Sequence, residues 1–217
     1  QLKLSNIAYE KVFLSPLSHA GYYPGAAVMT LKVIFEKETY KILGAQAVGY
    51  EGVEKRIDVI ATAIFAGLTA DKLKDLELSY APPYSSAKDP VNMAGFIIEN
   101  MKNGIVGQFY YEDIPSLQKR DDVTLLDTRT VYEYMRGHAE GFINIPVDEL
   151  RERLTELDSS KPVYVMCQSG LRSYLATRIL MQNGFDAYNF AGGYRLYGSM
   201  FYDEIVSKRA YDCGMEK

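Results

Sequence analysis

Cysteine is scarce in this chain of 217 residues, which has two, Cys167 and Cys213. Two distant cysteines make no disulfide framework, so we expect a reducing, cytoplasmic environment. The net charge is −4 and the basic residues form no cluster, which argues against a surface that binds nucleic acid or an anionic membrane. No apolar run is long enough to span a bilayer, and the N-terminus lacks the residue order of a signal peptide.

Motifs for nucleotides and metals are also missing. No Gly-x-Gly-x-x-Gly sequence follows a strand-like run, and there is no phosphate loop or cysteine pair. We therefore expect this chain alone to bind neither FAD nor NAD(P)H. His19 has no second metal-type ligand near it, which argues against a metal site. The chain opens directly into the strand-like Leu2–Leu4, like a segment cut from a longer protein.

The first half has the mixed pattern of an α+β domain. Val28–Glu36 and Lys41–Val48 are close together and strand-like, and apolar residues alternate within the first run, which predicts an antiparallel hairpin. A helix is predicted after Gly52, with an apolar stripe that we expect to face the core. The stripe comprises Ile57, Ile60, Ala61, Ile64 and Phe65.

Two further helices are predicted before the end of this half. Thr69 is a candidate N-cap for a helix from Ala70 to Leu76. Asp89-Pro90 has the residues of a cap and a first turn, and the helix that follows is expected to extend to Lys102.

Asn103-Gly104 marks the predicted boundary between two domains, residues 1–103 and 104–217. Beyond it, strand-like runs alternate with helical ones, which predicts an α/β domain with a mainly parallel central sheet covered on both faces. The expected strands are Val106–Tyr110, Val123–Leu126, Ile143–Ile145, Val163–Met166 and Ala187–Phe190. The expected helices are Pro115–Lys119, Val131–Arg136, Val147–Leu157, Leu171–Gln182 and a single closing helix at Tyr197–Val206.

One stretch of this second half has the features of a reactive site. An apolar run rich in β-branched residues ends at Cys167, and helical spacing begins at Leu171. Between them lie three loop-forming residues, Gln168, Ser169 and Gly170. A cysteine at such a junction faces backbone N–H groups and the positive end of a helix dipole, which favour an anion. We therefore expect Cys167 to react as a thiolate, with Arg172 as a nearby cation, rather than to be a small buried apolar residue.

The length of this loop separates two classes of enzyme. Four residues, Gln168 to Leu171, lie between Cys167 and Arg172. Cysteine-dependent phosphatases have one residue more, which makes a ring wide enough for a phosphoryl group, so a phosphatase is disfavoured. The shorter loop resembles that of the rhodanese sulfurtransferases. Residues 125–134, 137–146 and 189–193 resemble further segments of the same family, in the same order.

The resemblance implies a sulfur-transfer chemistry. Cys167 would carry sulfane sulfur as a persulfide, and the loop residues Gln168 to Leu171 together with Arg172 would bind the donor. Asp127 and Arg129 match the family's Asp-x-Arg pair, which we interpret as a buried structural ion pair in preference to a substrate contact. His138 lies in a matching motif in which the histidine orders a turn, so we do not expect it to act as a base for the cysteine.

The first half resembles a different family. Residues 19–26, 41–49, 55–58 and 80–86 resemble the C-terminal dimerisation domain of flavin-dependent disulfide reductases, and within that family the coenzyme A-disulfide reductases with a fused rhodanese domain. This resemblance implies a homodimer, and FAD, NAD(P)H and coenzyme A for the full-length protein. It also implies two tyrosines that face the coenzyme A sulfur from the partner subunit; by motif position these are Tyr22 and Tyr80, with Tyr23 as an adjacent alternative to the first.

The sequence thus favours the C-terminal portion of a flavin-dependent reductase of coenzyme A disulfide, persulfide or polysulfide, which acts on small sulfur-containing substrates. The alternative is a non-catalytic dimer scaffold with a regulatory or sulfur-carrier rhodanese module. Regulatory modules of this fold usually lack the cysteine, so Cys167 favours catalysis. Cys213 is interpreted as an incidental thiol, with a resolving role in an intersubunit disulfide as the alternative. The sulfur donor and the choice between NADH and NADPH stay open.

Overall fold

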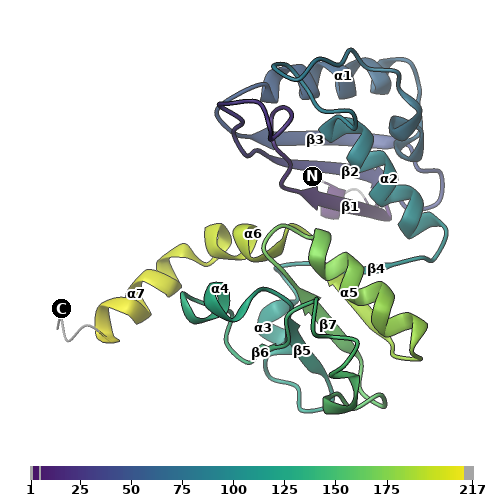
Figure 1. The fold of residues 1–217 in the computed structure, drawn as a ribbon. Helices are drawn as coiled ribbons and strands as arrows, with labels where there is room; N and C mark the ends of the chain where they lie inside the picture. Colours follow the sequence, from purple (N-terminus) through teal and green to yellow (C-terminus); the bar gives the residue numbers. More distant parts are fainter. Residues whose placement is uncertain (1, 5, 213–217) are drawn as a thin grey trace. The chain divides into compact units, whose positions relative to one another are not determined.

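The computed structural model describes residues 2–4 and 6–212 and divides the chain into two compact units, Gln1–Gly107 and Gln108–Lys217. Each unit has a sheet of its own (Figure 1). The first sheet has three strands and the second has five, in agreement with the predicted α+β and α/β organisation. The domain boundary after Asn103 stays a prediction.

The sheet of the first unit is antiparallel, with strand order β1-β2-β3. Its strands are β1 (Tyr9–Leu14), β2 (Thr30–Glu36) and β3 (Ile42–Val48). Leu31, Val33 and Phe35 alternate along β2 and are buried, as their spacing predicts. They form one apolar cluster with Ile60 and Ala94, which belong to the two long helices of the unit. Those helices therefore pack on one face of the sheet.

The helical elements of this unit are η1 (Leu2–Leu4), α1 (Val53–Phe65), η2 (Ala70–Asp75) and α2 (Pro90–Lys102). The start of α2 is as predicted. The Asp89 carboxylate accepts a hydrogen bond from the Val91 N–H, and the Asn92 side chain accepts one from the Asp89 N–H, which completes a capping box. A Cβ at Gly95 would lie 2.2 Å from the Lys74 nitrogen, so only glycine lets α2 approach η2 this closely.

Three of the expectations for this unit are wrong. The opening Leu2–Leu4 is a 3-10 turn instead of a strand, and the segment after Thr69 is a 3-10 helix in which Thr69 makes no side-chain cap. Most of the apolar stripe of α1 does not face the core: Ile60 is buried, but Phe65 is 94% exposed and Ile64 is 40% exposed. The helix also buries Arg56 and Ala63, which lie outside the stripe. Arg56 can be buried because its guanidinium donates to Asp89 and to two backbone carbonyls.

The sheet of the second unit has strand order β4-β8-β7-β5-β6, and the β5–β6, β5–β7 and β7–β8 pairs are parallel. Its strands are β4 (Gly107–Phe109), β5 (Thr124–Asp127), β6 (Ile143–Asn144), β7 (Val163–Met166) and β8 (Ala187–Phe190). Neighbouring residues along a strand enter different apolar clusters: Leu126 and Val165 enter one, and Leu125 and Met166 enter the other. Both faces of the sheet are therefore buried, as predicted.

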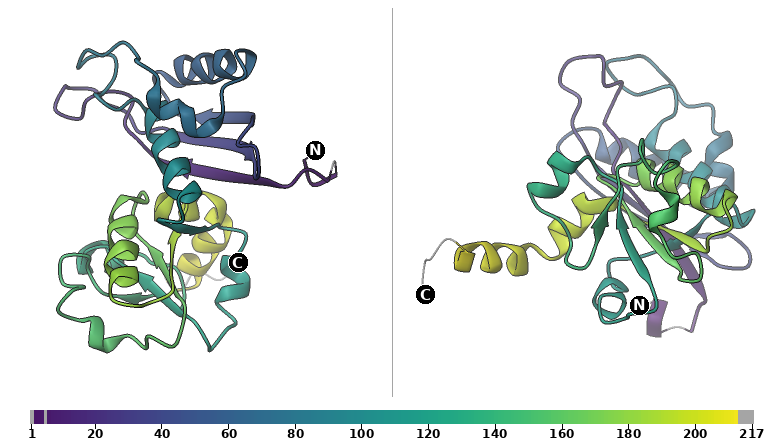
Figure 2. Two further views of the ribbon diagram at one scale, coloured as in Figure 1. Left: turned by 90° about the vertical axis from the view of Figure 1, so that its right-hand side faces the viewer. Right: turned by 60° about the horizontal axis from the view of Figure 1, so that its bottom comes forward.

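The helical elements of the second unit are α3 (Ile114–Leu117), α4 (Val131–Met135), η3 (Leu154–Glu156), α5 (Leu171–Gln182), α6 (Gly193–Met200) and α7 (Tyr202–Asp212). α5 lies along β7 and β8 (Figures 1 and 2). Among the described residues, no helix has both the length and the apolar character needed to cross a bilayer.

Two expectations for these helices are wrong. Residues 147–157 form turns and the short η3 in place of a helix, because hydrogen bonds such as Arg153 N–H to the Leu150 carbonyl span three residues. The predicted closing helix is two helices, α6 and α7, which meet at Phe201. The Phe201 ring packs against the Tyr197 ring, with 4.8 Å between centroids, so the chain turns where that ring enters the core.

Candidate active site

The candidate catalytic residues of the second unit lie at or just after the carboxyl ends of two central strands. Asp127, the last residue of β5, lies opposite Met166, the last residue of β7. From β5 the chain crosses to β6 on one side, and from β7 it crosses to β8 on the other. The loops after β5 and β7 therefore diverge and leave a crevice, which is where open parallel sheets bind ligands. Cys167 begins the loop after β7.

The Cys167 sulfur is buried and has two hydrogen-bond donors. The Gly170 N–H lies 3.1 Å from Sγ, and the Ser173 hydroxyl lies 3.2 Å from it. Cys167 is 1% exposed and Ser173 is fully buried. Gly170 has a φ of 107° immediately before α5, which turns its N–H back toward the cysteine. The sulfur thus lies at the N-terminal end of a twelve-residue helix, where a negative charge is favoured.

Helix α6 fixes this loop from the other side. The Tyr194 N–H donates to the Cys167 carbonyl at 2.7 Å, and the Arg195 N–H donates to the Gln168 carbonyl at 3.1 Å. A Cβ at Gly193 would lie 2.6 Å from the Ser169 nitrogen, so glycine is needed for the two backbones to meet. Because α6 binds the loop carbonyls, the carbonyl groups turn away from the sulfur and the loop N–H groups can face it.

Arg172 does not stand alone beside the cysteine. Its Nη1 and Nη2 each lie 2.7 Å from one carboxylate oxygen of Glu133, on α4. The pair is about one-third exposed. The Arg172 guanidinium, assisted by hydrogen bonds from Thr130, holds the pKa of Glu133 down to about 2 despite the opposing effect of burial. The cation that the sequence places next to the loop is therefore already paired with a carboxylate.

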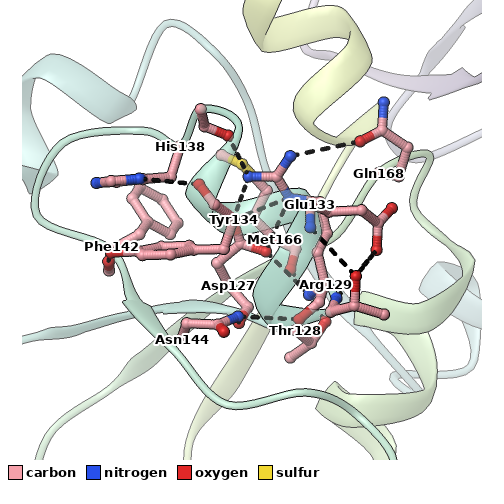
Figure 3. A network of polar contacts seen from close by, with 12 residues as sticks. Asp127, Thr128, Arg129, Glu133, Tyr134, His138, Phe142, Asn144, Met166 and Gln168 are labelled. Atoms are coloured by element: carbon pink, nitrogen blue, oxygen red, sulfur yellow. Dashed lines mark hydrogen bonds and ion pairs between the residues drawn. The ribbon is translucent and has the colours of Figure 1, made fainter.

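Asp127 and Arg129 form the buried ion pair that we predict. Their side chains are 0% and 2% exposed, and Arg129 Nη2 lies 2.7 Å from Asp127 Oδ2. Arg129 also donates to the Gly137 carbonyl at 2.8 Å. It reaches the Gln168 side chain at 3.5 Å (Figure 3). Its guanidinium stacks on the Tyr194 ring, 3.8 Å from the centroid. Arg129 thus connects the Cys167 loop, the segment after α4 and α6.

His138 has the turn-ordering role expected of it. Its Nδ1 lies 3.2 Å from the Tyr134 carbonyl, and its ring stacks on the Tyr134 ring with 3.9 Å between centroids. The Tyr134 hydroxyl in turn donates to the Phe142 carbonyl (Figure 3). These contacts close the segment between α4 and β6, and none of them involves Cys167.

The first unit brings the two candidate tyrosines together. The Tyr22 and Tyr80 hydroxyls are 2.7 Å apart although the residues are far apart in sequence, and both rings are exposed. The hydrogen bond to Tyr22 is the main reason that the pKa of Tyr80 is raised above its ordinary value. Tyr23 instead packs edge-on against His19, with 5.7 Å between ring centroids. The geometry therefore favours Tyr22 over Tyr23 as the partner of Tyr80.

A buried ion pair holds the loops that carry these tyrosines. Arg56 Nη2 lies 2.9 Å from Asp89 Oδ2 and 2.7 Å from the Ser18 carbonyl. The Ser85 hydroxyl donates to the same Asp89 oxygen, and the Ser85 carbonyl accepts from the Ala20 N–H at 2.9 Å. One carboxylate thus ties the loop before Tyr22 to the loop after Tyr80.

Two further candidate residues are His19 and Cys213. His19 is buried and its Nδ1 lies 3.1 Å from the Ala20 carbonyl. Within the described ranges no group of three or more His, Cys, Asp or Glu side chains could hold a metal ion. Cys213 lies outside the described residues.

Sequence reasoning missed three contributors to the cysteine site, namely Ser173, Glu133 and the N-terminus of α6. Ser173 follows Arg172 directly, so its place on the first turn of α5 was visible. Glu133 lies within residues 125–134, which resemble the rhodanese family, and the structure shows that it also completes a capping box with Thr130 at the start of α4. Nothing in the local sequence indicates that its carboxylate meets an arginine 39 positions away.

Two protein families match the two units. Residues 1–90 match the pyridine nucleotide-disulphide oxidoreductase dimerisation domain, and residues 111–199 match the rhodanese-like domain. The chain joins these two domains. The dimerisation domain carries Tyr22 and Tyr80, and the rhodanese-like domain carries the Cys167 loop.

Two solved structures match this chain across both domains, and a curated relative matches a part of it. The chain is 49% identical to reduced Bacillus anthracis CoADR-RHD, with a TM-score of 0.90 over 93% of this chain and 36% of that one. It is 41% identical to a NAD-dependent persulfide reductase from A. fulgidus, with a TM-score of 0.79 over 88% of this chain and 34% of that one. Coenzyme A disulfide reductase of Staphylococcus epidermidis is 45% identical over 94 residues, 43% of this chain and 22% of that protein. The chain therefore spans about a fifth to a third of the length of these relatives.

Proposed function

We propose that this chain is the C-terminal portion of a flavin-dependent reductase of coenzyme A disulfide, persulfide or polysulfide, and that its rhodanese-like domain transfers sulfur through a Cys167 persulfide. The observation that carries the proposal is the placement of the Cys167 sulfur. It lies at the N-terminal end of α5, between the Gly170 N–H and the Ser173 hydroxyl. Both donors stabilise negative charge on that sulfur, as in the resting thiolate.

The transfer has two balanced steps. The Cys167 thiolate attacks the outer sulfur of a donor such as thiosulfate, so that one S–S bond forms, another breaks and sulfite leaves. An acceptor thiolate then attacks the outer sulfur of the Cys167 persulfide, takes it as a new persulfide and restores the Cys167 thiolate. Neither step has a net oxidation, so this half of the reaction needs no cofactor. The two donors at Sγ stabilise the Cys167 thiolate, which begins the first step and is restored by the second.

The reductive half belongs to the rest of the proposed enzyme. FAD and NAD(P)H would supply electrons there, and coenzyme A would carry the sulfur. The described residues do not fit a dinucleotide, because the first sheet is antiparallel and no described strand leads through a Gly-x-Gly-x-x-Gly turn into a helix. We propose that this chain alone binds neither cofactor. A flavin absorbance band that co-purifies stoichiometrically with these 217 residues would contradict this.

The dimerisation domain supplies the second part of the proposal. We propose that it forms a homodimer and that Tyr22 and Tyr80 serve the reductase centre of the partner subunit. The hydrogen bond between their hydroxyls leaves one phenol as donor and the other as acceptor. A phenol that keeps its proton, as the raised pKa of Tyr80 favours, can donate it to a departing thiolate. The exposure of both rings is consistent with a role toward a partner or substrate.

The non-catalytic alternative predicts a different outcome in a simple assay. A scaffold with a regulatory module would not catalyse the transfer of sulfur from thiosulfate or from an organic persulfide to cyanide, whereas the proposed enzyme would. An aryl phosphate assayed in parallel tests the phosphatase alternative, which the short loop disfavours. Thiocyanate production without phosphate release is the expected result. Phosphate release without thiocyanate would overturn the proposal.

A further inference from the structure

The loop cation of the rhodanese-like domain is neutralised by a residue from another element. Both terminal nitrogens of Arg172 bind Glu133, at 2.7 Å each. Arg172 comes from the first turn of α5, next to the cysteine loop, and Glu133 comes from α4. The guanidinium can form two parallel hydrogen bonds to a carboxylate, and here it does so with a carboxylate of the protein itself.

Glu133 is held in this position by its own helix. Its Oε2 accepts hydrogen bonds from the Thr130 N–H and the Thr130 hydroxyl, at 3.0 Å each, and its N–H donates to that hydroxyl. The carboxylate therefore has four donors, two from Thr130 and two from Arg172. A donor anion that competed for Arg172 would have to displace a preorganised carboxylate and then lie beside its charge.

The charge of a sulfur donor determines how well it can approach Cys167 when Arg172 is paired. Thiosulfate brings two negative charges to a site that already holds the Cys167 thiolate. A protonated organic persulfide, R–S–SH, brings none on its reacting sulfurs. With Arg172 paired, the loop has no spare cation to offset the repulsion between thiosulfate and the thiolate.

The neighbouring cavity suits an organic group. A pocket of about 320 Å³ is lined by Glu133, by Gln168 of the loop and by the rings of Tyr132 and Tyr194. Arg136 also lines it and lies over the Tyr132 ring, 5.6 Å from the centroid. Aromatic walls can pack against the carbon chain of a thiol.

We propose that Glu133 is a specificity-determining residue that directs Cys167 toward organic persulfides and away from inorganic dianions such as thiosulfate. The inference rests on the proposed sulfur transfer at Cys167. In the favoured step the Cys167 thiolate attacks the outer sulfur of R–S–SH. One S–S bond forms, the other breaks, R–S⁻ leaves, and the proton stays on the transferred sulfur. Glu133 acts through the charge of Arg172 and touches neither reacting sulfur.

The test compares the rates at which two donors load sulfur onto Cys167. Quenched-flow mass spectrometry gives the second-order rate constant for thiosulfate and for glutathione persulfide. Glu133→Gln should raise the thiosulfate rate on the order of tenfold or more and change the persulfide rate less than about threefold, because both charges of thiosulfate lie on its reacting group whereas a protonated persulfide group carries none. Glu133→Asp keeps the charge and should stay close to the wild-type preference. Glu156→Gln, which removes a carboxylate paired with Arg153 elsewhere in the domain, should change neither rate.

The wild-type protein provides a measurement that does not depend on any variant. The rate at which thiosulfate loads sulfur onto wild-type Cys167 should stay flat or rise with added KCl. Salt screens charges, and no free cation attracts the thiosulfate in this account. A steep fall with KCl would overturn the proposal. So would equal rate increases for both donors in Glu133→Gln, or an Asp variant that behaves like the Gln variant. If wild-type Cys167 accepts sulfur from neither donor, the sulfur-transfer function itself is wrong, an outcome distinct from the others.

Discussion

Asp127 and Arg129 show how much of this domain depends on single buried charges. Both side chains are almost inaccessible, and Arg129 joins the Cys167 loop to α6 through Gln168 and Tyr194. Asp127→Asn leaves this guanidinium buried without its counter-charge, so we expect a loss of about 3–5 kcal/mol in unfolding free energy. Urea unfolding, followed at the transition of the rhodanese-like domain, measures it. Asp122→Asn is the matched control, since Asp122 pairs with Arg120 at the surface; an equal loss in both variants would contradict the assignment.

The Tyr22–Tyr80 pair gives a prediction about catalysis. In the intact reductase that we propose, Tyr22→Phe or Tyr80→Phe removes one hydroxyl of the 2.7 Å hydrogen bond. Each variant should reduce coenzyme A disulfide more slowly and still transfer sulfur from thiosulfate to cyanide at the wild-type rate. Tyr23→Phe should leave both activities unchanged, because Tyr23 packs on His19 instead. Equal loss of both activities in the Tyr22 and Tyr80 variants would indicate a packing role.

At the scale of residues, sequence predicts what is local. The place of Cys167 and its four-residue separation from Arg172 follow from spacing along the chain. The Arg172–Glu133 pair and the buried Arg56 do not, because they depend on how distant elements meet. Arg56 has the residue type of a solvated helix face, and it is buried because Asp89 lies opposite it in the fold.

The start of helix α4 is encoded by its own sequence, but the charge of its Glu133 interacts with Arg172 on another helix. Glu133 completes its capping box with Thr130, and Arg172 holds the pKa of Glu133 at about 2, below its ordinary value of 4.5. A carboxyl with a depressed folded-state pKa adds stability above its unfolded value, and this contribution is lost as the pH falls through the folded value.

This gives a pH-dependent prediction for the rhodanese-like domain. Wild-type stability should decrease as the pH falls from about 4.5 toward about 2, partly because Glu133 becomes protonated on unfolding. Glu133→Gln cannot take up that proton, so its urea midpoint should fall less over the same interval. Glu152→Gln removes an exposed glutamate of the same domain and should keep the wild-type slope. If the urea midpoints of the wild type and of Glu133→Gln fell in parallel as the pH decreases, the Glu133–Arg172 pair would not be a source of this pH dependence.

Strong local signals located several elements correctly. The alternation along β2 matches its burial, and α2 begins at the cap that its sequence predicts. Helix α5 lies where its helical spacing predicts a helix, but Leu171 and Leu175 of that spacing are exposed. Residues 147–157 have apolar residues at helical spacing, yet Leu150 and Leu157 reach the core from turns. Most of the α1 stripe was misread because Ile64 and Phe65 are exposed. An apolar stripe in the sequence does not show whether it faces the core or the surface.

At the scale of the molecule, the exposed residues of α1 support association of the dimerisation domain. Phe65 is almost fully exposed, and Tyr50 and Val48 are exposed near the end of β3. We expect sedimentation of this chain to show a two-fold dimer. Phe65→Glu should shift the equilibrium toward monomer if α1 lies at the interface, whereas Met135→Glu, at an exposed apolar residue of the rhodanese-like domain, should not. A wild-type monomer at high concentration would contradict the dimer.

The central claim is that Cys167 carries sulfur, and mass spectrometry tests it most directly. After treatment with thiosulfate or polysulfide, the peptide that contains Cys167 should gain sulfur and the peptide that contains Cys213 should not. Cys167→Ser should lose both the added sulfur and thiocyanate formation, because the sulfur held by Gly170 and Ser173 is then absent. Sulfur on Cys213 alone, or a Cys167→Ser variant that keeps its activity, would contradict the account.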